Sequence, residues 1–94
     1  MEIASIRSKA LKRLWLQSSV QGVPSDQLKR LRSALATLAA AADLPMLMTV
    51  PGWRLHELKG DRKGTWSMSV TGNWRLMFRA EGEIIYDLDL EDYH

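Results

Sequence analysis

Hydrophobic side chains recur at helical spacing in the first half of the chain. Between residues 7 and 17 they fall three and four positions apart, and a second such stretch runs to about residue 42. This pattern predicts two helices, the second capped by Ser25 or Asp26 and ended by Pro45. The apolar stripe of the second helix comprises Leu28, Leu31, Leu35, Leu38 and Ala42.

After Val50 the period changes from helical to alternating, which is typical of strands with one buried face. Residues 65–70, 74–80 and 83–90 alternate, with turns between them, and residues 53–58 and 2–6 are shorter strand candidates. The predicted inward positions are Trp66, Met68, Val70, Trp74, Leu76, Phe78, Ile84, Tyr86, Leu88 and Leu90, and the predicted outward positions are Thr65, Ser67, Ser69, Arg75, Met77 and Arg79. We therefore expect an α+β fold, a small antiparallel sheet with two N-terminal helices packed on one face.

Length and composition limit what this fold can be. The 94 residues suit a single domain over residues 1–94, with 46% hydrophobic residues. The four tryptophans are expected to build or border its core. No cysteine is present, which excludes disulfides and thiol chemistry. The start of the chain lacks the apolar run of a signal peptide, and no stretch is long enough to span a bilayer. We expect a cytoplasmic protein without membrane contact.

Charge is distributed unevenly along the chain. Residues 53–79 hold six basic side chains against two acidic ones, whereas residues 80–94 hold six acidic side chains and no lysine or arginine. The net charge of +2 conceals this separation. A basic surface attracts polyanions by releasing their counterions, so the segment from 53 to 79 is a candidate for binding nucleic acid. Ordinary solvated faces of mixed charge are the alternative interpretation.

The residues suited to chemistry lie in the second half. His56 and His94 each lie at or beside a predicted strand, so the sheet can bring them to one concave surface. Arg75 and Arg79 project from the same side of one strand. The neighbouring loop adds the cations Lys59, Arg62 and Lys63.

Such a surface has the groups that RNA cleavage by 2′-hydroxyl attack requires. A base takes the 2′-hydroxyl proton, an acid protonates the departing 5′-oxygen, and cations stabilise the charged phosphorane. Histidine suits both proton roles, and Tyr93 can stack on a base or orient the attack. Each residue alone also fits a structural or solvated role, and residues at a chain end are ordinarily frayed. A metal site built from His56, His94 and Asp92 is a further, less favoured alternative.

Three parts of the sequence resemble the HigB-type toxins (plasmid maintenance killer proteins) of the RelE/ParE superfamily. They are residues 51–62 (PGWRLHELKGDR), residues 64–79 with their GTWSM and NWRLMFR segments, and the closing Asp92-Tyr93-His94. The similarity covers nearly the whole chain and is most specific over residues 51–94. It implies the same small antiparallel sheet with two helices packed against it.

The resemblance also implies a function. The chain would be the toxin of a type II toxin–antitoxin system, a ribosome-dependent mRNA endoribonuclease that needs no metal or cofactor and inhibits translation. A HigA-type helix-turn-helix antitoxin would neutralise it, and the pair would bind operator DNA. The alternatives are a ParE-like inhibitor of DNA gyrase, which lacks the terminal triplet, and an inactive homologue that serves as a co-repressor subunit.

The candidate site combines the resemblance with the pattern of residues. Its predicted catalytic residues are His56, Arg75, Asp92, Tyr93 and His94, and its predicted contacts to RNA and phosphate are Lys59, Arg62, Lys63, Asn73 and Arg79. The α-carboxylate beside His94 favours a protonated imidazole, which makes His94 the expected acid and His56 the other proton carrier. Asp92 is expected to orient its neighbours.

Overall fold

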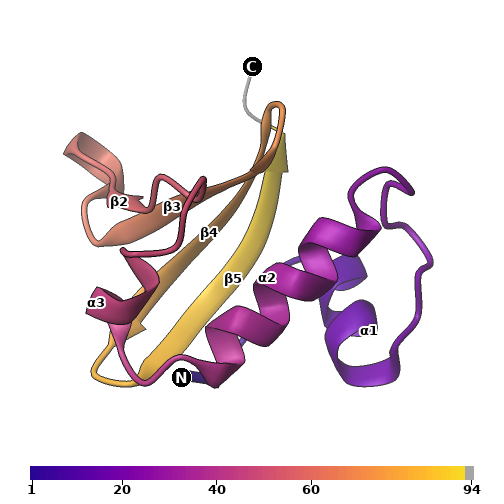
Figure 1. Cartoon of the computed structure of the whole chain (residues 1–94), viewed down its shortest axis with the longest axis horizontal. Helices are drawn as coiled ribbons and strands as arrows, with labels where there is room; N and C mark the ends of the chain where they lie inside the picture. The colour runs from indigo at the N-terminus through magenta and orange to yellow at the C-terminus, as the bar shows by residue number, and fades with distance from the viewer. Residues whose placement is uncertain (93–94) are drawn as a thin grey trace.

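The computed structural model describes residues 1–92, and within them the chain forms a five-stranded sheet of order β1-β5-β4-β3-β2 (Figure 1). The strands are β1 (Glu2–Ile3), β2 (His56–Glu57), β3 (Thr65–Thr71), β4 (Trp74–Glu81) and β5 (Ile84–Asp92). The strands from β2 to β5 pair antiparallel, as the alternation predicts. The short β1 pairs with β5 in parallel, so the sheet is mixed and the expectation of a wholly antiparallel sheet is wrong at this edge.

The predicted helices are present, but their ends differ from the prediction. They are α1 (Lys9–Gln17), α2 (Leu28–Ala40) and the one-turn α3 (Leu44–Leu47). Neither Ser25 nor Asp26 caps α2, because Pro24 to Gln27 forms a turn and Gln27 takes the N-cap position. Pro45 does not end α2 either. It lies in the first turn of α3, where the backbone needs no amide donor, and Asp43 caps that turn by accepting a hydrogen bond from Met46 N at 3.0 Å.

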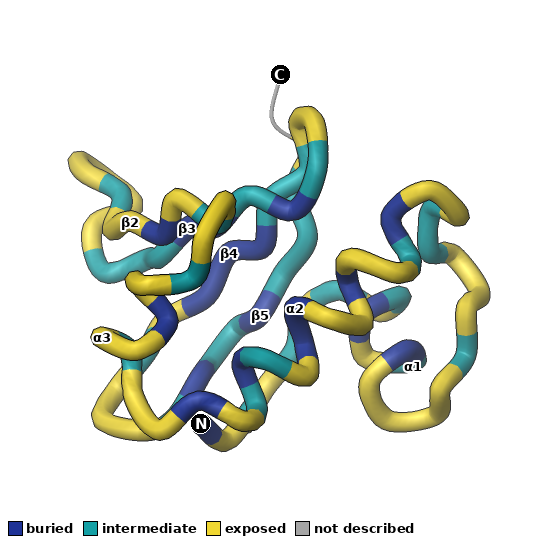
Figure 2. The backbone as a smooth tube through the Cα atoms, in the orientation of Figure 1, coloured by how far each residue is buried: buried dark blue, intermediate teal, exposed yellow. Residues whose placement is uncertain are grey.

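The core lies between α2 and one face of the sheet. Figure 1 shows α2 crossing that face diagonally, and Figure 2 shows the buried positions gathered along the line of contact. Its fully buried side chains include Leu11, Leu31, Leu35, Leu38, Leu47, Met68, Leu76, Phe78, Ile85 and Leu88. Three tryptophans pack against this core, as expected, whereas Trp15 is 36% exposed. Burial of this apolar surface is what holds the helices on the sheet.

A β-bulge interrupts the alternation of β5. Tyr86 pairs with Arg79 and Asp89 pairs with Met77, so β5 has one residue more than β4 over this interval. Asp87 takes up the extra length with a φ of 55°, and its amide donates a hydrogen bond to Ser5 Oγ at 2.8 Å. As a result Ile85 is buried instead of Ile84, and Tyr86 turns away from the core. The prediction that Ile84 and Tyr86 share the inward face with Leu88 is therefore wrong.

Candidate functional site

The face of the sheet opposite α2, called the open face here, carries three of the predicted site residues on its strands, His56, Arg75 and Arg79. Register places His56 beside Ser67, Ser67 beside Met77, and Met77 beside Asp89, in one row across four strands. Arg75 lies between Ser69 and Glu91 in the next row, and Arg79 lies between Thr65 and Tyr86 on the other side. Since paired residues project from the same face, His56, Arg75 and Arg79 share this surface, as predicted.

The centre of the open face is hollowed, which the alternation did not predict. Met77 is only 4% exposed and Ser67 only 1%, although both project away from α2. Arg7 on one side and the loop around Arg62 on the other rise above the sheet and enclose a hollow of about 190 Å³. We call this hollow the trough. Its lining comprises Arg7, Asp61, Arg62, Thr65, Met77, Phe78, Arg79, Asp87, Asp89 and Glu91.

His56 lies on the short strand β2 with its side chain exposed to solvent. Its Nδ1 lies 2.8 Å from the carbonyl oxygen of Arg54. Because a carbonyl oxygen can only accept a hydrogen bond, Nδ1 must carry the proton, and Nε2 of the neutral ring then holds the lone pair. Arg54 has a φ of 50°, unusual for a residue with a side chain, and this backbone turn brings its carbonyl to the imidazole. The geometry suits His56 to accept a proton through Nε2.

The two arginines of β4 are held differently. Arg75 is half-buried, and one Nη of its guanidinium donates to the hydroxyl of buried Ser67 at 3.2 Å. Arg79 is exposed and lies against Gly64, where an added Cβ would come within 3.4 Å of its Nη2. Gly64 also has a φ of +93°, so both its backbone and the space beside Arg79 favour glycine at this position.

The 3₁₀ turn η1 (Gly60–Arg62) carries the loop cations. Lys59 and Lys63 flank it and are exposed. Arg62 reaches from this loop across β3 and β4 to β5, where its guanidinium donates two hydrogen bonds to the carboxylate of Glu91, one of them at 3.1 Å. These hydrogen bonds lower the pKa of Glu91 and raise that of Arg62. Arg62, predicted to bind phosphate, thus already holds an anionic partner.

Asn73 and Asp92 lie at the far end of the sheet. Asn73 is exposed in the turn between β3 and β4. Asp92 pairs with Trp74, so its register position is on the face that carries the core and not on that of Arg75. Figure 1 shows the end of β5 next to the turn between β3 and β4. The predicted Tyr93 and His94 lie outside the described residues.

Four residues of this face were not among the sequence candidates. Ser67 orients Arg75, Glu91 holds Arg62, and Asp89 and Tyr86 lie beside Met77 and Arg79. The sequence alone does not point to the acidic residues, because the acidic residues 80–94 follow the basic segment 53–79 as a separate stretch of the chain. In three dimensions β5 lies next to β4, so the two charge groups share one surface.

The described residues set two further bounds. Across residues 1–92, no helix is both long and apolar enough to cross a membrane. Within the same range, no three histidine, aspartate or glutamate side chains are gathered closely enough to hold a metal ion.

Comparison with known proteins identifies the family. Residues 4–94 match the family described as the RelE-like toxin of the type II toxin–antitoxin system HigB. The chain belongs to this family. It is also 37% identical over 92 residues to a protein named Endoribonuclease HigB from Proteus vulgaris, with 98% of this chain and 99% of the relative covered. Membership of a toxin–antitoxin family implies an antitoxin partner for this HigB-like toxin.

Solved structures confirm the fold of the HigB-like chain. YafQ from E. coli strain BL21(DE3) superposes with a TM-score of 0.65 at 13% identity, covering 98% of this chain and 93% of YafQ. A YoeB/ParE toxin from Agrobacterium tumefaciens gives a TM-score of 0.59 at 16% identity, covering 100% and 99%. At these identities the likeness concerns the fold alone. The RelE-like α+β architecture expected from the sequence is therefore confirmed.

Proposed function

We propose that this HigB-like toxin is an endoribonuclease that cuts mRNA on the ribosome and so inhibits translation in the cytoplasm. The observation that carries the proposal is the arrangement around His56. Its Nε2 is available as a base, and arginines lie in the rows on both sides of its own. The 37% identical relative from Proteus vulgaris is named an endoribonuclease, which supports the same activity here.

In the proposed reaction His56 Nε2 takes the proton of a ribose 2′-hydroxyl. The 2′-oxygen attacks the adjacent phosphorus, and the bond from phosphorus to the 5′-oxygen breaks. The products are a 2′,3′-cyclic phosphate and a 5′-hydroxyl, whose proton comes from His94. Arg75, held by Ser67, neutralises the phosphorane, and this stabilisation requires no metal ion.

The remaining candidates would bind and position the RNA. Lys59, Lys63 and Arg79 are exposed cations at the rim of the open face and suit contacts to flanking phosphates. Asn73 would contact RNA from the turn at the far end of the sheet, Tyr93 would position a base, and Asp92 would orient its neighbours. Arg62 contributes to phosphate binding only when a phosphate displaces Glu91.

We propose further that a HigA-type helix-turn-helix antitoxin neutralises the toxin and that the pair binds operator DNA through the antitoxin. The ribosome would present the message by holding it against the open face and its trough.

The test is cleavage of mRNA on purified translating ribosomes by wild-type protein and by His56→Asn. The asparagine amide can still donate to the Arg54 carbonyl but cannot act as a base, so the cleavage rate should fall about 10²- to 10⁴-fold at an unchanged melting temperature. Deletion of Tyr93 and His94 should have a comparable effect. Asp26→Asn, in the turn before α2, is the matched control.

If His56→Asn cleaves mRNA at the wild-type rate, the proposed role of His56 is refuted. Absence of cleavage by the wild-type protein would refute the nuclease itself. A parallel DNA gyrase supercoiling assay tests the ParE-like alternative, and a growth assay after expression without antitoxin tests the inactive co-repressor alternative.

A further inference from the structure

A second hollow, larger than the trough, opens at the end of the sheet where β3 begins. Its volume is about 530 Å³, within the range of small-molecule sites. The pairing of β3 with β4 ends at Thr65 and Arg79, so Ala80 and Glu81 continue β4 with only β5 beside them. The hollow, called the notch here, fills the place that a longer β3 would occupy.

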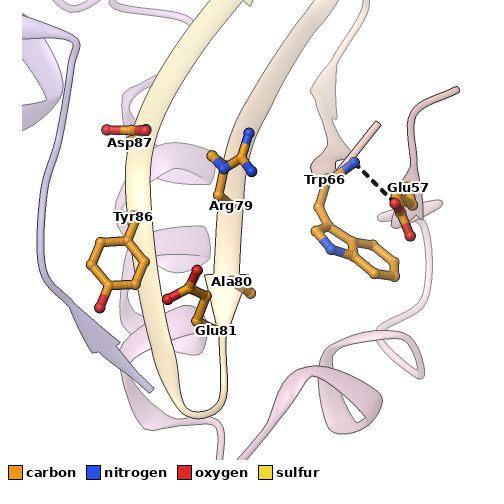
Figure 3. Close-up of a pocket in the computed structure, with 8 residues that line it drawn as sticks. Glu57, Trp66, Arg79, Ala80, Glu81, Tyr86 and Asp87 are labelled. Atoms are coloured by element: carbon orange, nitrogen blue, oxygen red, sulfur yellow. Dashed lines mark hydrogen bonds between the residues drawn. The ribbon is translucent and has the colours of Figure 1, made fainter. Parts of the chain in front are cut away.

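Aromatic side chains bound the notch on two sides. Figure 3 shows Tyr86 on the β5 side and Trp66 on the β3 side, with Arg79 and Glu81 on the strand between them. Tyr86 and Trp66 are both half-buried, so each ring combines a fixed position with accessible surface. Tyr86 lines the notch only because the bulge at Asp87 turns its side chain away from the core. Bulges often re-aim a side chain in this way beside functional sites.

The charges of the notch favour an uncharged ligand that donates hydrogen bonds. Three carboxylates, those of Glu57, Glu81 and Asp87, line it against the single guanidinium of Arg79. The Glu57 carboxylate is held in place because its Oε2 accepts the amide hydrogen of Gly64 at 2.9 Å. Ionised carboxylates only accept hydrogen bonds, so they attract amino groups and repel phosphate.

Arg79 connects the notch to the trough, because its side chain lines both hollows. If Arg79 holds a phosphate at this boundary, the nucleotide that carries this phosphate can place its base in the notch. Aromatic rings are the usual stacking surface for unpaired bases, and carboxylates bind exocyclic amino groups of bases.

We propose that the notch is a nucleobase subsite for the RNA that lies in the trough. One unpaired base stacks on Tyr86, Trp66 closes the far wall, and Glu57 and Glu81 accept hydrogen bonds from its amino group. Adenine, cytosine and guanine carry such a group. Uracil presents carbonyl oxygens instead and is disfavoured. The inference rests on the proposed function, since it assumes that RNA occupies the open face.

The experiment maps cleavage sites on ribosome-bound messages with randomised sequence around the cut. Wild-type protein should under-represent uracil at one position beside the scissile phosphate. The double variant Glu57→Gln/Glu81→Gln should lose this bias, because an amide also donates to uracil oxygens. Tyr86→Leu should lower kcat/KM about tenfold through lost stacking, and Tyr86→Phe, which keeps the ring, should restore it.

Glu83→Gln, on an exposed glutamate of the turn between β4 and β5, is the matched control. Two results would overturn the subsite while leaving the nuclease intact. One is a bias against uracil that is as strong in Glu57→Gln/Glu81→Gln as in the wild-type protein. The other is an unchanged kcat/KM in Tyr86→Leu. If Tyr86→Leu unfolds, the double carboxylate variant decides, because both of its side chains are exposed. If the wild-type protein cleaves no message at all, the proposed function itself is refuted.

Discussion

At the scale of single residues, the role of Arg62 depends on its partner. The sequence presents it as one of three loop cations, but the fold pairs it with Glu91 from a distant strand. The side chains of this ion pair are 49% and 34% exposed, so solvent screens their attraction. An RNA phosphate that approaches Arg62 therefore competes with a carboxylate that the pairing keeps ionised.

The ion pair predicts a pH dependence of stability. Hydrogen bonds from Arg62 hold the pKa of Glu91 below its ordinary value of 4.5, so the folded state gains stability above that value. Near neutral pH the free energy of unfolding of the wild-type protein should exceed that of Glu91→Gln by at most about 1 kcal/mol. This advantage should disappear as the pH falls through the lowered pKa, because the carboxylate is then protonated in both states.

Urea unfolding of both proteins over a series of pH values measures the difference. Glu2→Gln, an exposed carboxylate on β1, is the control variant. A gap between wild type and Glu91→Gln that stays constant into strong acid would contradict the assignment.

At the scale of elements, the bulge in β5 decides which of its side chains lie on the open face. It assigns Ile85 to the core and Tyr86 to the open face, the reverse of strict alternation from Leu88. Ser5, in the segment after β1, accepts a hydrogen bond from the Asp87 amide and donates a longer one to its carboxylate at 3.5 Å. The edge segment therefore supports the irregular backbone of its neighbour.

Replacing Ser5 with Ala should lower the free energy of unfolding by about 1 kcal/mol, because the Asp87 amide loses its side-chain acceptor. Chemical denaturation measures the loss. Ser25→Ala, on an exposed serine in the turn before α2, should have little effect. Equal stability of Ser5→Ala and wild type would show that the bulge needs no support from this segment.

At the scale of the whole molecule, folding mixes charges that the sequence keeps apart. Residues 80–94 are acidic, but β5 lies beside the basic β4. Asp89 and Glu91 therefore project from the same face as Arg75 and Arg79. The open face has exposed cations at one part of its rim, at Lys59, Lys63 and Arg79, carboxylates in the notch, and both charges at its centre, which suits RNA held through its backbone beside the cations.

The predicted cations imply a salt-dependent affinity for single-stranded RNA. If Lys59, Lys63, Arg75 and Arg79 each neutralise one phosphate, the logarithm of the association constant should fall with the logarithm of salt with a slope of roughly −3. The double variant Lys59→Gln/Lys63→Gln should reduce the slope by about 1.4. Fluorescence anisotropy of a labelled oligonucleotide measures it.

Lys29→Gln, on an exposed side chain of α2 on the opposite side of the sheet, should leave the slope unchanged. An unchanged slope in Lys59→Gln/Lys63→Gln would place the RNA elsewhere.

Much of this protein follows from its sequence because the relevant patterns are local. The stripe of Leu31, Leu35 and Leu38 predicts a helix with one buried side, and these leucines are buried in the core. Leu76 and Phe78 predict the inward face of β4, and the opposite parity brings Arg75 and Arg79 together on the other face. His56 joins that face because the short strand β2 pairs with β3. The α+β class and the grouping of these three site residues needed no more than this.

The tertiary structure alone decided what depends on contacts between distant segments. Three features depend on residues far apart in sequence: the parallel pairing of β1 with β5, the bulge at Asp87 with its hydrogen bond to Ser5, and the pairing of Arg62 with Glu91. No periodicity of the sequence encodes them. Met77 and Ser67 are buried because other parts of the chain rise around them, although their own strands mark them as outward. A period of two determines which face a side chain takes, but whether that face is flat or hollow depends on what lies beside it in space.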